Sequence, residues 1–282
     1  MSELKKFRAV RYVLPLREGG SLPAVVEMEG GELYVVKFRG AGQGAKALIA
    51  ELIVGRIGHT LGLPVPDLSL VHLDEPLART EPDPEIQDIL LGSVGTNVGL
   101  GYLESSFMFD PLAVEDLDPR LVVNTVWLDA LTTNVDRTHR NPNILYREDG
   151  LWLIDHGAAL YFHHNWGGLT PETIATPFVP IKDHILLNRV EDEKLLREVD
   201  QANAELLTSE VLEAIINQIP EELLLDAPPG NPPVFSSAEE GRAAYLDYFM
   251  RRLAGPRAFV DQIWTSAETV RNEPLEMRGY RR

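Results

Sequence analysis

Residues 134–145 have the sequence NVDRTHRNPNIL, and residues 153–157 have the sequence LIDHG. Two apolar runs lie between these motifs, and a polar turn with Asp149-Gly150 separates the runs, so this stretch predicts a β-hairpin. Because a hairpin brings its two ends together, Asp136 and nearby carboxamides would lie beside Asp155. Converging acid and amide oxygens are what Mg²⁺ and a phosphoryl acceptor require. The sequence therefore predicts a metal-assisted site at the mouth of this hairpin.

The composition is that of an acidic globular protein. The 282 residues are 44% hydrophobic, carry a net charge of −17 and include no cysteine. The length predicts two domains or lobes, and the lack of cysteine excludes disulfides, thiolate metal sites and cysteine nucleophiles. The N-terminus lacks an apolar signal segment, which favours a cytoplasmic location. No apolar run is long enough for a membrane span, and the acidic charge disfavours a nucleic-acid partner.

The first hundred residues predict a small antiparallel sheet with one helix. Glycine-bearing turns separate the β-prone stretches, and residues 45–61 have a helical pattern that stops at Gly62. Residues 74–86 are acidic and contain prolines, so we expect a loop there. The strands are expected at residues 7–15, 23–28, 33–38 and 68–73.

The remainder of the chain predicts a mainly helical lobe. Asp118 is a suitable N-cap, and Pro119 a suitable first residue, for the helix that precedes the hairpin. We therefore predict an α+β fold with a sheet lobe at residues 1–103 and a helical lobe at residues 104–282. Later helices are expected at residues 183–189, 191–205, 208–217, 237–254 and 256–271.

A lysine and a glutamate in the first lobe form a predicted ion pair. Lys37 lies inside an apolar strand, where its charge is costly unless paired. Glu51 follows on the edge of the apolar face of the helix. The alternative is an edge strand whose lysine reaches water, but the aspartates downstream favour a pair that directs the ammonium group toward a phosphate.

The order of these features resembles the protein-kinase-like superfamily: a glycine turn, a strand lysine, a helix glutamate, an Asp/Asn loop, a hairpin and an Asp before glycine. The details look most like HipA-type serine/threonine kinases, in GSLP at 20–23, YVVKF at 34–38, LGLPVP at 61–66 and NVDRTH at 134–139. The last motif also resembles the catalytic loop of phosphatidylinositol kinases. The resemblance covers roughly residues 10 to 165 and implies a two-lobed protein-kinase-like fold.

The resemblance implies an ATP- and Mg²⁺-dependent kinase that acts on a hydroxyl acceptor. A protein serine or threonine is favoured over a small molecule as that acceptor. Asp136 would orient or deprotonate the attacking hydroxyl. Lys37 would hold the phosphates of the nucleotide, and Glu51 would hold Lys37. The phosphate-covering turn would consist of Gly19, Gly20 and Ser21.

The metal ligands implied by the resemblance are Asp155 and an asparagine. Asn141 lies five residues after Asp136, the usual spacing. Asn143 directly precedes the strand, where the family's metal-binding asparagine stands. An insertion would explain both facts, so we favour Asn143 and keep Asn141.

Three departures from the kinase pattern affect what is carried over. His156 replaces the phenylalanine of the Asp-Phe-Gly motif, and residues 158–176 contain no arginine or lysine for a phosphate-ordered activation loop. The lysine strand begins near residue 33, so the N-terminal domain of toxin-type HipA kinases is expected to be missing. We therefore do not expect their antitoxin or DNA partners.

Other functions fit parts of the sequence. A nucleotide-binding pseudokinase or scaffold fits His156 and the asparagine insertion, and a lipid or small-molecule kinase fits the Asp-Arg-Thr-His loop, although the net charge of −17 disfavours an anionic membrane. A metal hydrolase would use Asp136, His139, Asp155 and His156 as ligands, but no His pair with helical spacing supports it. Arg137 would face a phosphate or pair with a carboxylate, and its neighbours leave both open.

Overall fold

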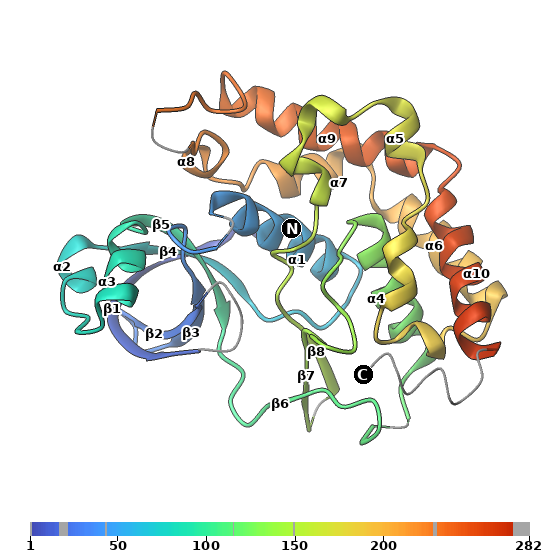
Figure 1. The fold of residues 1–282 in the computed structure, drawn as a ribbon, viewed down its shortest axis with the longest axis horizontal. Coiled ribbons are helices and arrows are strands. Elements are labelled where there is room, and N and C mark those ends of the chain that lie inside the picture. The colour runs from blue at the N-terminus through green and yellow to red at the C-terminus, as the bar shows by residue number, and fades with distance from the viewer. Residues whose placement is uncertain are drawn as a thin grey trace. The chain divides into compact units, whose positions relative to one another are not determined.

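The computed structural model describes residues 2–16, 22–42, 44–114, 116–148, 150–227 and 230–272. The fold is α+β, and the chain divides into two compact units (Figure 1). Unit 1 consists of Met1–Arg56, Pro66–Glu104 and Ala214–Ala243. Unit 2 consists of Ile57–Val65, Ser105–Glu213 and Ala244–Arg282. Helices α1 (Ala45–Thr60), α7 (Ser209–Ile216) and α9 (Ala238–Ala254) continue from one unit into the other, and α8 (Glu221–Leu224) belongs to unit 1.

Unit 1 is built on a closed five-stranded barrel with the order β1-β2-β3-β5-β4. Its strands are β1 (Lys5–Pro15), β2 (Ala24–Met28), β3 (Leu33–Lys37), β4 (Leu68–Leu73) and β5 (Gly95–Gly101). The pairs are antiparallel except β1 with β4, which is parallel. The expected antiparallel sheet is therefore wrong in part, because β1 pairs with β4 along Lys5–Arg8 and then with β2 across irregularities that bend it.

The core of unit 1 also includes two short helices, α2 (Glu75–Ala78) and α3 (Pro84–Leu91), where a loop was expected at residues 74–86. Their prolines stand in the first helical turn, where no backbone N–H is needed. The carboxylate of Asp83 accepts a hydrogen bond from the backbone N–H of Glu85 and caps α3. The helices add Ala78, Ile86 and Leu90 to the apolar cluster. The expectation of a single helix in this part of the chain is corrected accordingly.

Gly40 holds the connection between β3 and α1 against the end of α3. A Cβ atom at Gly40 would lie 2.6 Å from the carbonyl oxygen of Ile89 and 2.9 Å from the carbonyl carbon of Gly92. The N–H of Gly40 also donates to Ser93 Oγ at 2.8 Å. Only glycine fits this close backbone approach.

Gly40→Ala is therefore expected to lower the free energy of unfolding by about 1–3 kcal/mol, the usual cost of overpacking. Gly101→Ala is the matched control, because a Cβ there meets its nearest atoms at 3.7 Å, an ordinary contact. Urea denaturation followed by far-UV circular dichroism measures both variants. Equal midpoints for the two would contradict the steric argument.

Unit 2 is mainly helical. A small sheet has the order β6-β7-β8, from β6 (Phe107–Met108), β7 (Ile144–Arg147) and β8 (Gly150–Leu153). Its helices include α4 (Pro119–Leu131), α5 (Pro171–Ala175), α6 (Glu193–Leu206) and α10 (Ala258–Asn272). Helix α10 packs against α4 and α6, and Trp127 meets Phe259 edge to face at 5.8 Å in this interface.

The predicted helices after residue 190 are confirmed to within about two residues at α6, α7, α9 and α10. Residues 183–189 differ, because they lie in 3₁₀ turns, η3 (Val179–Asp183) and η4 (Leu187–Arg189). His184 interrupts the helical path between them with extended dihedral angles of −66° and 131°. The side chain of His184 forms a hydrogen bond with the buried carboxylate of Asp129.

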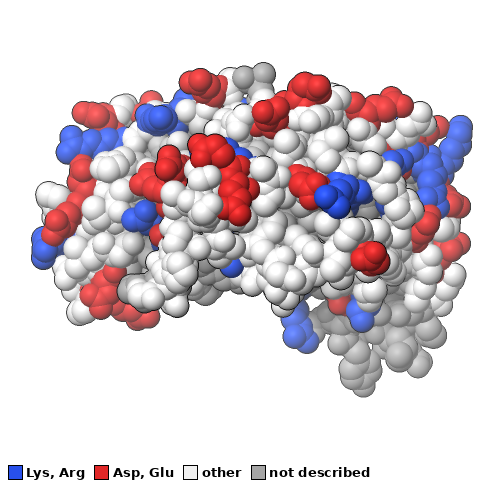
Figure 2. Space-filling view, turned by 90° about the horizontal axis from the view of Figure 1, so that it is seen from above, with Lys and Arg blue, Asp and Glu red and all other residues white. Residues whose placement is uncertain are grey.

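The surface keeps the acidic character of the composition. Figure 2 shows Asp and Glu side chains spread over the face it presents, with Lys and Arg between them. Several basic side chains pair with acidic neighbours, as Arg79 does with Glu75 at 2.5 Å, and such exposed pairs contribute little stability. Within the described part of the chain, no helix combines the length and apolar character needed to cross a bilayer.

Candidate active site

Unit 1 contributes a buried ion pair. Lys37 Nζ lies 2.6 Å from Glu51 Oε2, and the side chains are 8% and 0% exposed. Strand β3 pairs with β2 on one side and β5 on the other, so Lys37 does not stand on an edge strand. The predicted pair of Lys37 and Glu51 is therefore present, and the alternative of a lysine that reaches water from an edge is not.

Unit 2 contains the predicted hairpin. Strands β7 and β8 pair from Ile144 with Leu153 to Arg147 with Gly150. The N–H of Ile154 then donates to the carbonyl oxygen of Asn143 at 3.1 Å, which continues the pairing to the hairpin mouth. The chain segments before β7 and after β8 are thereby held side by side, as the sequence predicted.

Both candidate asparagines contact Asp136. Asp136 Oδ2 accepts hydrogen bonds from Asn141 Nδ2 at 2.8 Å and Asn143 Nδ2 at 3.2 Å. Asn143 Nδ2 also lies 3.1 Å from the carbonyl oxygen of Asp136. The backbone N–H of Asp136 donates to Asn134 Oδ1 at 3.1 Å. Two asparagine side chains therefore hold the Asp136 carboxylate, and a third, Asn134, holds the Asp136 backbone.

Asp155 stands close enough to Asp136 for its charge to matter. Burial raises the pKa of Asp136, and the negative charge of Asp155 raises it further, against opposing hydrogen bonds from Asn143 and Asn141. Asn143 and Asp155 both have left-handed backbone conformations, with φ of 48° and 52°. Such conformations are uncommon outside glycine and gather at functional sites.

A buried network around Asp129 supports this loop, and our sequence interpretation missed it. The carboxylate of Asp129 accepts hydrogen bonds from Arg137 Nε at 2.5 Å, His184 Nε2 at 2.9 Å and Asn134 Nδ2 at 2.9 Å. Arg137 therefore pairs with a carboxylate, which settles the choice that its neighbours left open. The signal for Asp129 was its place in an apolar run of α4, the same signal that identified Lys37.

The charges of this network follow from its hydrogen bonds. Burial alone would raise the pKa of Asp129, but the positive charge of Arg137 and the hydrogen bonds of His184 and Arg137 lower it. The N–H of Leu186 donates to His184 Nδ1 at 3.1 Å, so the proton of the neutral ring is on Nε2 and faces Asp129. Burial lowers the pKa of His184, against the opposing effect of Asp129.

Acid is expected to destabilise unit 2 through His184. An ordinary histidine pKa is 6.5, and the folded value is lower, so below about pH 6.5 the unfolded chain binds a proton that the folded chain does not. The free energy of unfolding therefore falls as the pH drops from about 6.5 toward the folded pKa. His184→Gln keeps a donor for Asp129 without titrating, and its slope there should be smaller by up to about 1.4 kcal/mol per pH unit.

Urea denaturation followed by tryptophan fluorescence is the measurement for His184→Gln, because all four tryptophans belong to unit 2. Equal slopes for wild type and His184→Gln would show that His184 is not held neutral in the fold.

The other positions named from the sequence are the phosphate-covering turn and the two histidines of the metal-hydrolase alternative. Gly19, Gly20 and Ser21 lie outside the described residues. His156 is fully buried, whereas His139 is exposed. Across the residues that the structure describes, no group of three or more His, Asp or Glu side chains is placed to hold a metal ion.

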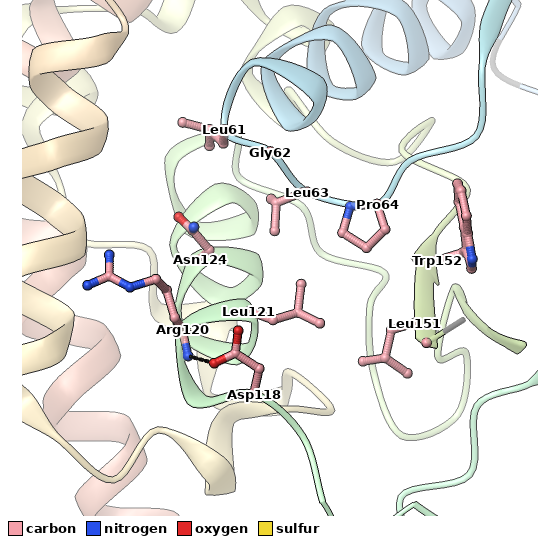
Figure 3. Close-up of a pocket in the computed structure, with 11 residues that line it drawn as sticks. Leu61, Gly62, Leu63, Pro64, Asp118, Arg120, Leu121, Asn124, Leu151 and Trp152 are labelled. Carbon is pink, nitrogen blue, oxygen red and sulfur yellow. Dashed lines mark hydrogen bonds between the residues drawn. The ribbon is translucent and has the colours of Figure 1, made fainter. Parts of the chain in front are cut away.

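A separate cavity of about 350 Å³ opens between the loop after α1, the start of α4 and strand β8. None of the predicted site residues lines it. Figure 3 shows Pro64, Leu121 and Leu151 facing its centre, while the guanidinium of Arg120 points away. The Asp118 carboxylate is occupied by the backbone N–H of Arg120 at 3.0 Å. The cavity is therefore lined by apolar side chains together with three polar ones, Asp118, Arg120 and Asn124.

Comparison with known proteins identifies the family. The family model described as HipA-like kinase matches residues 10–235. This match covers most of the chain, so the chain belongs to the HipA-like kinase family, as the resemblance predicted. No curated protein matches the chain significantly.

Solved structures show the fold. The Helicobacter pylori proinflammatory kinase CtkA is similar with a TM-score of 0.54 and 13% identity, over 95% of this chain and 99% of that chain. The Golgi casein kinase with Mn/ADP bound gives a TM-score of 0.45 and 11% identity, over 96% of this chain and 75% of that chain. The likeness to CtkA shows a shared kinase-like fold, which together with family membership supports a phosphotransferase.

Proposed function

We propose that the chain is an ATP-dependent protein kinase that phosphorylates serine or threonine hydroxyls with the help of Mg²⁺. The observation that carries this proposal is the Asp136 carboxylate. In a chain of a kinase family, it is fixed by Asn141 and Asn143 beside Asp155 at the mouth of a hairpin. This is the arrangement that phosphoryl transfer needs at the acceptor side.

Asp136 is the proposed catalytic carboxylate. It would accept a hydrogen bond from the acceptor hydroxyl, direct the oxygen toward the γ-phosphorus and take the proton as the new O–P bond forms, while the bond from the γ-phosphorus to the β–γ bridging oxygen breaks and ADP leaves. The raised pKa of Asp136 suits this role, because it increases the proton affinity of the carboxylate. The two amides that hold Oδ2 fix its direction.

Lys37 is the proposed phosphate ligand of unit 1. Its side-chain nitrogen is paired with Glu51 at 2.6 Å, which fixes its position within a buried strand. In this role Glu51 positions Lys37 without touching the nucleotide. Gly19, Gly20 and Ser21 are proposed to cover the phosphates with their backbone N–H groups.

Asp155 and an asparagine are the proposed metal ligands. Mg²⁺ is commonly held by one or two protein oxygens together with substrate phosphates. A carboxylate and an amide oxygen would supply such protein ligands. Both Asn143 and Asn141 direct their nitrogens to Asp136, so the oxygen of either amide is the atom left for a cation. When bound, the metal would neutralise charge on the phosphates.

A nucleotide-binding pseudokinase is the second candidate. One observation favours it: His156, at the position of the usual phenylalanine, is fully buried in the fold. A polar ring at this position departs from the motif that orients the metal-binding aspartate in active protein kinases.

The test is phosphoryl transfer by the purified chain. The chain is incubated with γ-labelled ATP, MgCl₂ and a bacterial lysate, and parallel reactions contain EDTA or phosphatidylinositol vesicles. The expected result is Mg²⁺-dependent label on serine or threonine. Nucleotide-dependent stabilisation in a thermal shift without label transfer would favour the pseudokinase, and label in the lipid fraction would favour a lipid kinase.

A further inference from the structure

Arg137 forms a fully buried ion pair in unit 2. Its side chain is 0% exposed, as is that of its partner Asp129. Its Nη2 is buried without a hydrogen-bond partner among the described residues. Buried ion pairs seldom repay their loss of hydration, and an unsatisfied buried nitrogen adds to the cost. A role beyond stability would account for this arrangement.

The hydrogen bonds of Arg137 reach one residue of the proposed metal site, Asn143, and the residue that precedes the other, Asp155. Arg137 Nη1 donates to the carbonyl oxygen of Asn143 and, at 3.2 Å, to the carbonyl oxygen of Ile154, the residue before Asp155. Nε of the same side chain is held by Asp129. One guanidinium therefore joins the segment before β7, the segment after β8 and helix α4.

Arg137 donates to the carbonyl oxygen of one residue with a left-handed backbone, Asn143, and to the carbonyl oxygen that precedes another, Asp155. Asn143 has a φ of 48° and Asp155 a φ of 52°. Residues in this conformation persist only where surrounding contacts fix them. The carbonyl oxygen of Asn143 accepts hydrogen bonds from the N–H of Ile154 and from Arg137 Nη1, and the same Nη1 donates to the carbonyl oxygen of Ile154. One guanidinium therefore ties the backbone at Asn143 to the backbone that enters Asp155.

We propose that Arg137 is a positioning residue that sets the places of Asn143 and Asp155, with Asp129 and His184 as its anchor. The proposal rests on the proposed kinase function for its catalytic meaning, but its structural content is independent of it. Outer groups that orient metal ligands typically change metal affinity or activity by 10–100-fold when they are removed.

Arg252 provides a matched control. It is likewise a buried arginine of unit 2, 4% exposed, and it donates to the carbonyl oxygens of Ala130, Leu131, Ile174 and Thr176. None of these acceptors belongs to the loop at 134–143 or to the segment at 154–155. Two of the acceptors, Ala130 and Leu131, follow Asp129 in α4, so Arg252→Lys should disturb the end of α4 and the fold near α5, while Arg137 keeps its hydrogen bonds to Asn143 and Ile154.

The experiment compares Arg137→Lys with Arg252→Lys in the full chain. Lysine keeps a positive charge near Asp129, but its single ammonium nitrogen lacks the rigid fork by which Nε reaches Asp129 and Nη1 reaches the two carbonyl oxygens. Hydrogen exchange followed by mass spectrometry is expected to rise about 10-fold in peptides containing residues 141–145 and 153–157 for Arg137→Lys only. The Mg²⁺ concentration for half-maximal phosphoryl transfer is expected to rise by about 10-fold or more, and Arg252→Lys should leave it unchanged.

A folded Arg137→Lys with wild-type exchange in both segments would overturn the proposal, as would equal changes in the two lysine variants. If Arg137→Lys does not fold, Asp129→Asn, which keeps the shape of the anchor but not its charge, should give the same exchange pattern. Absence of phosphoryl transfer in wild type would refute the proposed function alone. The exchange measurement needs no activity and would still decide whether Arg137 holds the two segments.

Discussion

Asp136→Asn is expected to lower kcat by about 10³-fold, the typical range for loss of a general base, and to leave nucleotide affinity near that of wild type. The asparagine oxygen can still accept hydrogen bonds from Asn141 and Asn143, so the loop keeps its shape. What is lost is the group that takes the acceptor proton. Initial rates with labelled ATP and saturating acceptor measure kcat, and thermal shift with Mg²⁺ and nucleotide measures binding.

Stability should move in the opposite direction from activity in this variant. The pKa of Asp136 is raised in the fold, chiefly by burial, so its ionised form is less favourable in the folded than in the unfolded chain at neutral pH. Asp136→Asn removes this unfavourable term and is expected to have an equal or higher Tm. A gain in stability with a loss of activity is typical of residues kept for function.

Asp116→Asn is the control for the charge change in Asp136→Asn. Asp116 is exposed and lies outside the site. The Asp116→Asn variant should keep the kcat and Tm of wild type. The catalytic role of Asp136 would be rejected if Asp136→Asn retained more than about one tenth of the wild-type kcat, a smaller loss than general-base catalysis accounts for.

The sequence predicted the parts of the site that depend on local contacts. The Asp-Gly turn and its flanking apolar runs specified the hairpin, and the hairpin in turn placed Asp136 near Asp155. Lys37 and Glu51 were paired because a single charge inside an apolar strand requires a partner. In each case, a strong local rule was enough.

The features that the sequence did not predict depend mostly on contacts between segments that are distant in the chain. Asp129 and His184 are 55 residues apart, and nothing in the neighbourhood of His184 marks it as a partner. The parallel pairing of β1 with β4 likewise joins residues more than sixty positions apart, which strand periodicity does not encode. Helix α3 is a different case, because Asp83-Pro84 is the same start signal that was recognised at Asp118-Pro119.

The largest effect on stability is expected at the ion pair of unit 1. Lys37→Met should lower the free energy of unfolding of unit 1 by about 3–5 kcal/mol, because it removes the cation that lies 2.6 Å from the buried carboxylate of Glu51. It should also abolish phosphoryl transfer. These two effects are confounded in the single variant, since a poorly folded kinase is inactive whatever the role of its lysine.

The double variant Lys37→Met/Glu51→Met separates them. Replacing both partners of a buried pair by apolar side chains of similar volume is often neutral or stabilising, so most of the lost stability should return while phosphoryl transfer stays absent. Hydrogen exchange in peptides from α1 is the appropriate probe, because all four tryptophans belong to unit 2. If the double variant regained both stability and activity, Lys37 would be a structural residue and would not be the phosphate ligand. If the double variant regained neither stability nor activity, the buried charge of Glu51 would not be the cause of the stability lost in Lys37→Met, because the double variant has no charge at either position.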